Sequence, residues 1–220
     1  MTAQDTKISK KDTAKKTTKS YYFDLIDPKF DLSSLEKVAR LKGFCTHKGQ
    51  TNLAGLFNDF WKMANGLGAN SFIIDSTEQK LDSLFVHISI YHLTLHQVDT
   101  NFNLYPKNMI YVFGDLDSSR EKGRKIQFNS QEKVLMPLKY ISYQNKVKEK
   151  TIISNGGFTG TKVKIKGKEG RLPTFLSLQG FRIGPSASIN QVGLSFSTGR
   201  INPVEQSFGQ FLIRVLEEMK

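Results

Sequence analysis

The chain has 220 residues, of which 38% are hydrophobic and 24% charged, and its formal net charge is +12 at pH 7. This composition excludes a wholly disordered protein and is compatible with one domain of ordinary size or two small ones. No apolar run approaches the roughly 20 residues of a membrane-spanning helix, and the single cysteine excludes an internal disulfide or a multi-cysteine metal site.

The first twenty residues contain six lysines and almost no apolar side chains, which predicts a disordered basic leader over residues 1–20. The leader contains no apolar core of a signal peptide. Its start, Thr2-Ala3-Gln4, resembles the start of exported proteins of Bacteroidota-type bacteria whose signal has been removed. We therefore expect export, with Met1 as an added start; a native cytoplasmic start is the alternative.

Residues 21–105 are predicted to form an α/β unit. A turn is expected at Asp27-Pro28, then a helical turn opened by Asp31 or Ser33 and a strand over residues 38–45. An amphipathic helix follows, capped by Thr51 or Asn52 and ended by Gly66 and Gly68. Its apolar stripe consists of Leu53, Leu56, Phe57, Phe60, Trp61, Ala64 and Leu67. A short buried strand is expected in 70–75, a polar turn in 76–80 and a long strand over 83–98.

The passage from Met63 to Ile73, a helix end followed by Gly-Leu-Gly-Ala-Asn and a strand, resembles one in small exported bacterial domains of the YbjQ-like and stress-protein type. The resemblance extends over residues 51–96. It implies a strand-helix-strand-strand unit, with the helix packed across an antiparallel or mixed sheet, and it implies no active site.

Residues 106–220 are predicted to be rich in strands and to end in a helix. Turn-forming residues separate the expected strands, which are residues 109–113, 125–128, 134–143, 151–154, 162–166, 175–183 and 192–197. The helix is expected to begin at Asn202 as the cap, with Pro203 at the first helical position and Glu205 three residues after the cap. The fold class is thus α+β, and the two parts could also form one continuous domain.

The positive charge is concentrated in residues 120–182, which contain fifteen basic and four acidic residues, whereas residues 21–119 contain eight basic and eleven acidic ones. Such a region attracts anions, but lysines that alternate with apolar residues are also typical of the solvated face of a strand. The predicted basic surface consists of Arg120, Lys122, Arg124, Lys125, Lys162, Lys164, Lys166, Lys168 and Arg171.

Cys45, His47, His87, His92 and His96 are the candidate metal ligands, but a metal site is not the favoured interpretation. On one strand His92 and His96 would lie about 13 Å apart, too far for one zinc ion. His87 would face the opposite side unless a bulge turns it, and a bulge is expected near Ile90–Tyr91, where the apolar positions switch from even to odd. Half-buried strand histidines are the favoured interpretation.

We find no catalytic signature in the sequence. Asp115 and Asp117 lie in a turn, and Ser195 lacks the second glycine of a nucleophile elbow. No cofactor is expected, and a hydrolase-like enzyme is the least favoured interpretation.

We predict a non-enzymatic accessory or interaction protein, exported to the periplasm or associated with the outer membrane. Its basic surface on residues 120–182 would contact a protein or an anionic component of the cell envelope. The alternative is a cytoplasmic nucleic-acid-binding protein, which is disfavoured because lysine predominates over arginine and few aromatic residues lie nearby.

Overall fold

The computed structural model describes residues 22–46, 53–81, 83–116, 122–155, 161–178 and 201–219. The described residues form two compact units, the first up to Tyr105 and the second from Pro106 onward. Helices and mixed sheets occur together and a helix lies near the C-terminus, which confirms the α+β class. The predicted leader lies outside the described residues. None of the helices in the described part of the chain combines the length and the apolar character needed to cross a bilayer.

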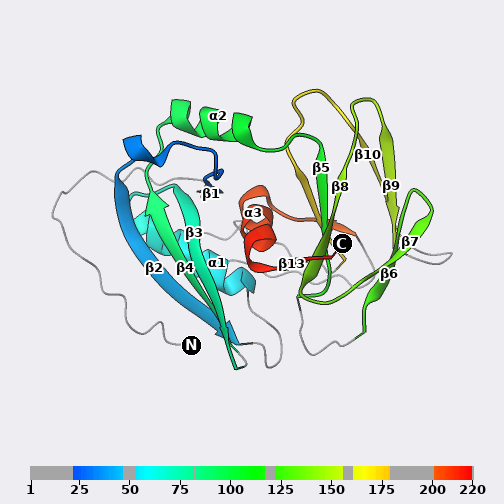
Figure 1. Ribbon diagram of the computed structural model, residues 1–220, viewed down its shortest axis with the longest axis horizontal. Helices are drawn as coiled ribbons and strands as arrows, with labels where there is room; N and C mark the ends of the chain where they lie inside the picture. The colour runs from blue at the N-terminus through cyan, green and yellow to red at the C-terminus, as the bar shows by residue number, and fades with distance from the viewer. Residues whose placement is uncertain are drawn as a thin grey trace, which may run out of the picture. The chain divides into compact units, whose positions relative to one another are not determined.

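The first unit contains one four-stranded sheet in the order β1-β3-β4-β2 (Figure 1). Strand β1 is parallel to β3, and the other neighbours are antiparallel. The predicted strand-helix-strand-strand unit is present as β2-α1-β3-β4. The elements are β1 (Asp24–Leu25), the 3-10 turn η1 (Leu32–Ser34), β2 (Lys37–Thr46), α1 (Leu53–Gly66), β3 (Ser71–Lys80), β4 (Ser83–Tyr91) and α2 (Leu95–Leu104).

Helix α1 packs on one face of this sheet. Its apolar stripe is buried except for half-buried Trp61 and exposed Leu67. The helix approaches β2 closely at Gly43, where a Cβ atom would lie 2.4 Å from Leu56 Cδ1. Gly68, with a φ of 77°, ends the helix in the left-handed conformation that glycine favours.

Two sequence predictions in the first unit are wrong. The segment 76–80 is not a turn, because it extends β3 as far as Lys80 and pairs with β4. Strand β4 ends at Tyr91, and residues 95–98 begin helix α2 instead. The reason is a capping box: Thr94 and Gln97 satisfy each other's backbone N–H groups, which stabilises a helix start that an apolar pattern alone does not reveal.

The second unit contains two sheets. One has the strand order β10-β9-β6-β7 and the other β12-β11-β5-β8-β13. The strands are β5 (Met109–Phe113), β6 (Arg124–Phe128), β7 (Gln131–Leu135), β8 (Lys139–Gln144), β9 (Lys150–Ser154), β10 (Lys162–Lys166), β11 (Thr174–Ser177), β12 (Asn202–Pro203) and β13 (Glu217–Glu218).

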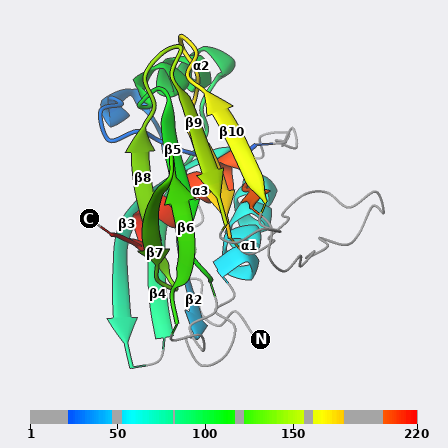
Figure 2. The same cartoon turned by 90° about the vertical axis from the view of Figure 1, so that its right-hand side faces the viewer.

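The two sheets face each other across an apolar core, to which both contribute alternate side chains. The five-stranded sheet supplies Ile110, Val112 and Ile141, and the four-stranded sheet supplies Ile126 and Ile153. Figure 2 looks onto the outer face of the four-stranded sheet. Helix α3 (Gln206–Val215) packs on the five-stranded sheet, where Gly209 allows it to approach Phe175.

The sequence predictions for the second unit need three corrections. The expected strand 134–143 is two strands, β7 and β8, because the chain bends at Pro137 and at Leu138, which has a φ of 55°. Asn202 and Pro203 do not cap a helix; they pair with β11. Helix α3 begins only after Glu205, whose carboxylate accepts from the N–H groups of Ser207 and Phe208. Residues 179–183 and 192–197, expected to be strand, lie outside the described residues.

Candidate functional site

The outer face of the four-stranded sheet carries a row of lysines at its β10 edge. Val163 packs against the core and Ile165 is buried in it, so the side chains of Lys162, Lys164 and Lys166 point to the opposite, exposed face. The two-residue period places neighbouring lysines about 6.6 Å apart along the strand. All three basic residues of β10 are lysines, whose ammonium groups are compact and strongly hydrated charges.

Strand β9 and the turn before it extend this row. Lys150 lies directly opposite Lys166 in the antiparallel ladder, and Ile152 lies opposite Lys164. Lys146 and Lys148 are exposed in the β8–β9 turn, where Lys148 has a φ of 70° that glycine would favour. We call Lys146, Lys148, Lys150, Lys162, Lys164, Lys166 and Lys168 the lysine surface. Residues 145–171 contain eight basic and two acidic residues in all.

Two buried asparagines position the loops that carry this charge. Asn108 donates through Nδ2 to the carbonyl oxygen of Lys168 and accepts through Oδ1 from its N–H, both at 2.9 Å. Asn145 donates to the carbonyl oxygen of Ile165 at 3.1 Å. Arg171 adds a hydrogen bond from Nη1 to the carbonyl oxygen of Lys166. The lysines thus project from a backbone that is held by buried polar contacts.

The remaining predicted basic residues are arranged differently. Arg124 points inward, and its Nε lies 2.8 Å from Oδ2 of Asp115, a carboxylate that is only 2% exposed. Lys125 is exposed, but its Nζ lies 2.9 Å from Oε1 of Glu132, so its charge is paired. Lys122 is exposed, and Arg120 lies outside the described residues. By contrast, the lysine surface forms no ion pair with any residue that the structure describes.

Lys150 and Lys166 face each other with like charges, an arrangement that destabilises a sheet. We expect Lys166→Glu to raise the free energy of unfolding by about 0.2–1 kcal/mol at low salt, because it replaces a repulsion by an attraction. Urea denaturation measures the change. Lys164→Glu, which faces Ile152, is the control, and an equal or larger gain there would contradict the prediction.

The first unit presents a second exposed feature, an aromatic pair on the sheet face opposite α1. Phe44 of β2 is 52% exposed and lies beside Phe85 of β4, with 5.6 Å between the ring centroids. Lys42 Nζ lies 5.3 Å from the centroid of the Phe85 ring. The sequence does not reveal this pair, because Phe44 and Phe85 are forty-one positions apart in the chain.

The candidate metal ligands lie in separate places. Cys45 points to the α1 face of the sheet and His87 to the other face. His92 follows β4, with Nδ1 3.0 Å from the carbonyl oxygen of Gly68, and His96 is exposed on α2. The expectation that His92 and His96 share a strand is wrong. The bulge beside Ile90–Tyr91 lies on β2, between Lys37 and Ala39. His47 lies outside the described residues, which contain no cluster of three or more potential ligands.

Burial raises the pKa of the Cys45 thiol to about 11. At pH 8 we expect a thiol reagent to label the native protein at least roughly a hundredfold more slowly than the urea-unfolded protein, because the thiolate is the reactive form. The same shift contributes stability that is present below about pH 9 and is lost as the pH rises toward 11. Equal labelling rates in the native and unfolded states would contradict a buried thiol.

Lys146, Lys148 and Lys150 are not among the predicted basic-surface residues. Their alternation matches that of residues 162–168 and could have revealed them, but only the β9–β10 pairing shows that Lys150 and Lys166 share a face. Comparisons of the chain with protein-family models, with curated proteins and with solved structures find no match. The resemblance of residues 51–96 to YbjQ-like domains therefore stays a prediction.

Proposed function

We propose that this protein is a non-enzymatic binding protein of the bacterial envelope that holds an acidic polysaccharide against its lysine surface. The observation that carries this proposal is the row of lysines on β9 and β10, which has no ion pair within the described residues. Ordinary solvated strands tolerate scattered lysines, but here Lys150 and Lys166 face each other at a cost in stability. A polymer of carboxylates would relieve that repulsion.

The type of cation also favours a polymer of simple acidic groups. Lysine attracts anions as a point charge, whereas arginine is preferred where flat, bidentate recognition of a base or phosphate is needed. The outward-facing apolar neighbour, Ile152, offers no ring on which a base could stack. A carboxylated sugar chain needs only charges at regular intervals, which the strand period provides.

Calorimetric titration of the full chain with oligogalacturonate, at about 50 and about 200 mM salt, tests the proposal. We expect binding at the lower salt concentration and a clear loss of affinity at the higher one, because counterions compete for the lysines. Dextran, a neutral polysaccharide, is the control and should not bind. No heat of binding with oligogalacturonate at the lower salt concentration would refute the proposed function.

Single-stranded nucleic acid is the second candidate ligand, and the Phe44–Phe85 pair is the observation that favours it. Aromatic rings beside lysines on a sheet face can stack bases while the cations contact phosphates. A fluorescent oligonucleotide titrated under the same salt conditions distinguishes the two candidates. Tight binding that Phe44→Ala weakens about fivefold or more would favour nucleic acid, since stacking contributes about 1–3 kcal/mol per base.

The envelope location is a separate part of the proposal and rests on the resemblance to exported domains. Fractionation of a bacterium that carries the gene tests it, with the protein detected by antibody. Recovery in the periplasmic or outer-membrane fraction is expected. Recovery in the cytoplasm alone would refute this part of the proposal and would favour nucleic acid as the ligand.

A further inference from the structure

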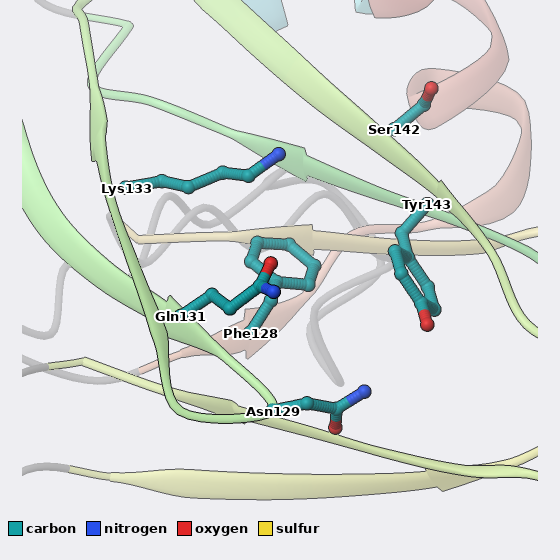
Figure 3. A pocket seen from close by; sticks show the side chains of 6 residues that line it. All are labelled: Phe128, Asn129, Gln131, Lys133, Ser142 and Tyr143. Carbon is teal, nitrogen blue, oxygen red and sulfur yellow. The ribbon is translucent and has the colours of Figure 1, made fainter.

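A small hollow of about 150 Å³ opens between β7 and β8 in the second unit. Figure 3 shows Lys133 and Gln131 extending from β7 over the ring of Phe128, with Tyr143 of β8 opposite. The lining is completed by Ser142 and Asn129 and contains no carboxylate. A cavity of about this volume in another protein holds one benzene molecule, so the hollow has room for a single six-membered ring.

The floor of the hollow is aromatic and its upper side is cationic. The rings of Phe128 and Tyr143 lie 6.0 Å apart, centroid to centroid, at an interplanar angle of 37°. Lys133 Nζ lies 6.0 Å from the centroid of the Phe128 ring and has no carboxylate partner among the described residues. A ring that enters here would meet apolar surface on one side and an uncompensated positive charge on the other.

The hydroxyl groups of the lining are oriented by carboxylates outside it. Tyr143 donates to Oε1 of Glu149 at 3.0 Å, and Ser142 donates to Glu218. The hydrogen bond to Glu149 raises the pKa of Tyr143, which keeps its hydroxyl protonated. Neither hydroxyl serves as an acceptor in the hollow, because Tyr143 already interacts with the side chains of Asn129 and Thr151 and the Ser142 hydroxyl points away from the Phe128 ring (Figure 3). The side-chain amide of Gln131, which lies over the Phe128 ring (Figure 3), can both accept from and donate to hydroxyl groups. The hollow therefore offers an amide for hydroxyl groups as well as a cation for an acid.

We infer that this hollow is a subsite for one uronic-acid residue, a pyranose ring that carries a single carboxylate. The carboxylate would pair with Lys133, the C–H face of the sugar would lie on Phe128 and Tyr143, and ring hydroxyls would hydrogen-bond with the side-chain amide of Gln131. An aromatic acid would lose the hydroxyl contacts and a neutral sugar the ion pair.

The subsite lies at the β7 edge of the four-stranded sheet, opposite to its β10 edge, and it approaches the lysine surface at the β8–β9 turn, where Glu149 accepts from Tyr143. Asn129 pairs with Ile152 of β9 through two hydrogen bonds of 2.8 and 2.9 Å, and Ile152 lies directly opposite Lys164. Glu149, the acceptor for Tyr143, precedes Lys150. The inference rests on the proposed function, because it assigns to the hollow one residue of the acidic polysaccharide that the lysine surface would hold.

The test is a ¹⁵N–¹H NMR titration of the full chain with galacturonate. Methyl galactoside keeps the ring without the charge, benzoate keeps a ring and the charge without hydroxyls, and inorganic phosphate supplies charge alone. We expect galacturonate to shift the amide signals of residues 128–133 and 142–143 saturably, with weak affinity, and the three other probes to shift them at least about tenfold less at equal concentration.

A second titration, with trigalacturonate, distinguishes a site for the free sugar from a site for one residue of a polymer. Trigalacturonate should bind more tightly than galacturonate if its other sugar residues contact the lysine surface.

Lys133→Met removes the charge but keeps an unbranched side chain over Phe128, and it should weaken galacturonate binding at least about tenfold. Lys62→Met, which changes an exposed lysine of α1 outside the lysine surface, is the matched control and should leave galacturonate binding unchanged. Lys164→Met, on the lysine surface, should weaken polymer binding. All three lysines are exposed, and the dispersion of the amide signals shows whether each variant is folded.

The outcomes separate the subsite from the proposed function. Saturable shifts at the hollow that Lys133→Met abolishes support the subsite, whether or not the polymer binds. Absence of such shifts, equal shifts with benzoate or phosphate, or unchanged binding by Lys133→Met overturn it. If oligogalacturonate still binds in that case and depends on Lys164, the proposed function stands without the subsite.

Discussion

Replacing Lys162, Lys164 and Lys166 by glutamine is expected to weaken oligogalacturonate binding roughly a hundredfold at low salt, on the basis of about 1 kcal/mol for each lysine that contacts an anionic surface. The three side chains share one exposed face of β10, and none has an ion pair within the described residues. Their removal should also make the remaining binding less sensitive to salt, because fewer counterions are released. Calorimetry at two salt concentrations measures both effects.

The control for this variant removes the same net charge from a different surface. Lys29, Lys37 and Lys62 are exposed in the first unit, and their joint replacement by glutamine should change the affinity less than about threefold. Equal losses in the two triple variants would mean that the overall charge of the chain, and not the lysine surface, attracts the polymer. That result would remove the basis of the proposed site.

Gly209→Ala should lower the free energy of unfolding by about 1–3 kcal/mol, the usual cost of overpacking a core. A Cβ atom at this position would lie 2.3 Å from Phe175 Cγ and 2.6 Å from its Cδ2. The Phe175 ring cannot move aside easily, because it is stacked 5.2 Å from Tyr111 and 6.2 Å from Phe113. Urea denaturation followed by circular dichroism measures the loss.

Alanine is more favourable than glycine in a helix by up to about 1 kcal/mol. Without close packing, Gly209→Ala would therefore raise the free energy of unfolding, so a decrease indicates a steric cost. Gly66→Ala at the end of α1 is the matched control, since a Cβ atom there meets nothing within 4 Å. The control should be neutral or stabilising. A Gly209→Ala variant as stable as the Gly66→Ala variant would contradict close packing of α3 on the sheet.

Several elements could be predicted because their signals are local. Helix α1 has an apolar stripe at helical spacing and glycines at its end, and β10 alternates lysine with apolar residues. Other elements were predicted wrongly because a polar local sequence is compatible with a turn, whereas hydrogen bonds to a neighbouring strand make it part of a sheet. The segment 76–80 is polar and exposed, yet it forms part of β3 because β4 supplies hydrogen-bond partners along its whole length.

The candidate site shows the same division. The sequence shows that residues 120–182 carry an excess of positive charge. It does not show that Arg124, one of these basic residues, points inward and pairs with buried Asp115. Lys133 was in the charged segment without being recognised, because its relation to Phe128 and Tyr143 depends on how β7 and β8 face each other. Side chains from separate strands converge only when the sheets pack.

The sequence by itself therefore determined the α+β class, the strand-helix-strand-strand order and the excess of positive charge in residues 120–182. These follow from periodicity and composition, which act over a few neighbouring residues. Only the tertiary structure decided which lysines have no ion pair within the described residues, that Lys150 faces Lys166, and that a hollow lies beside Lys133. Those properties depend on strand register and sheet packing, which bring together residues far apart in the chain.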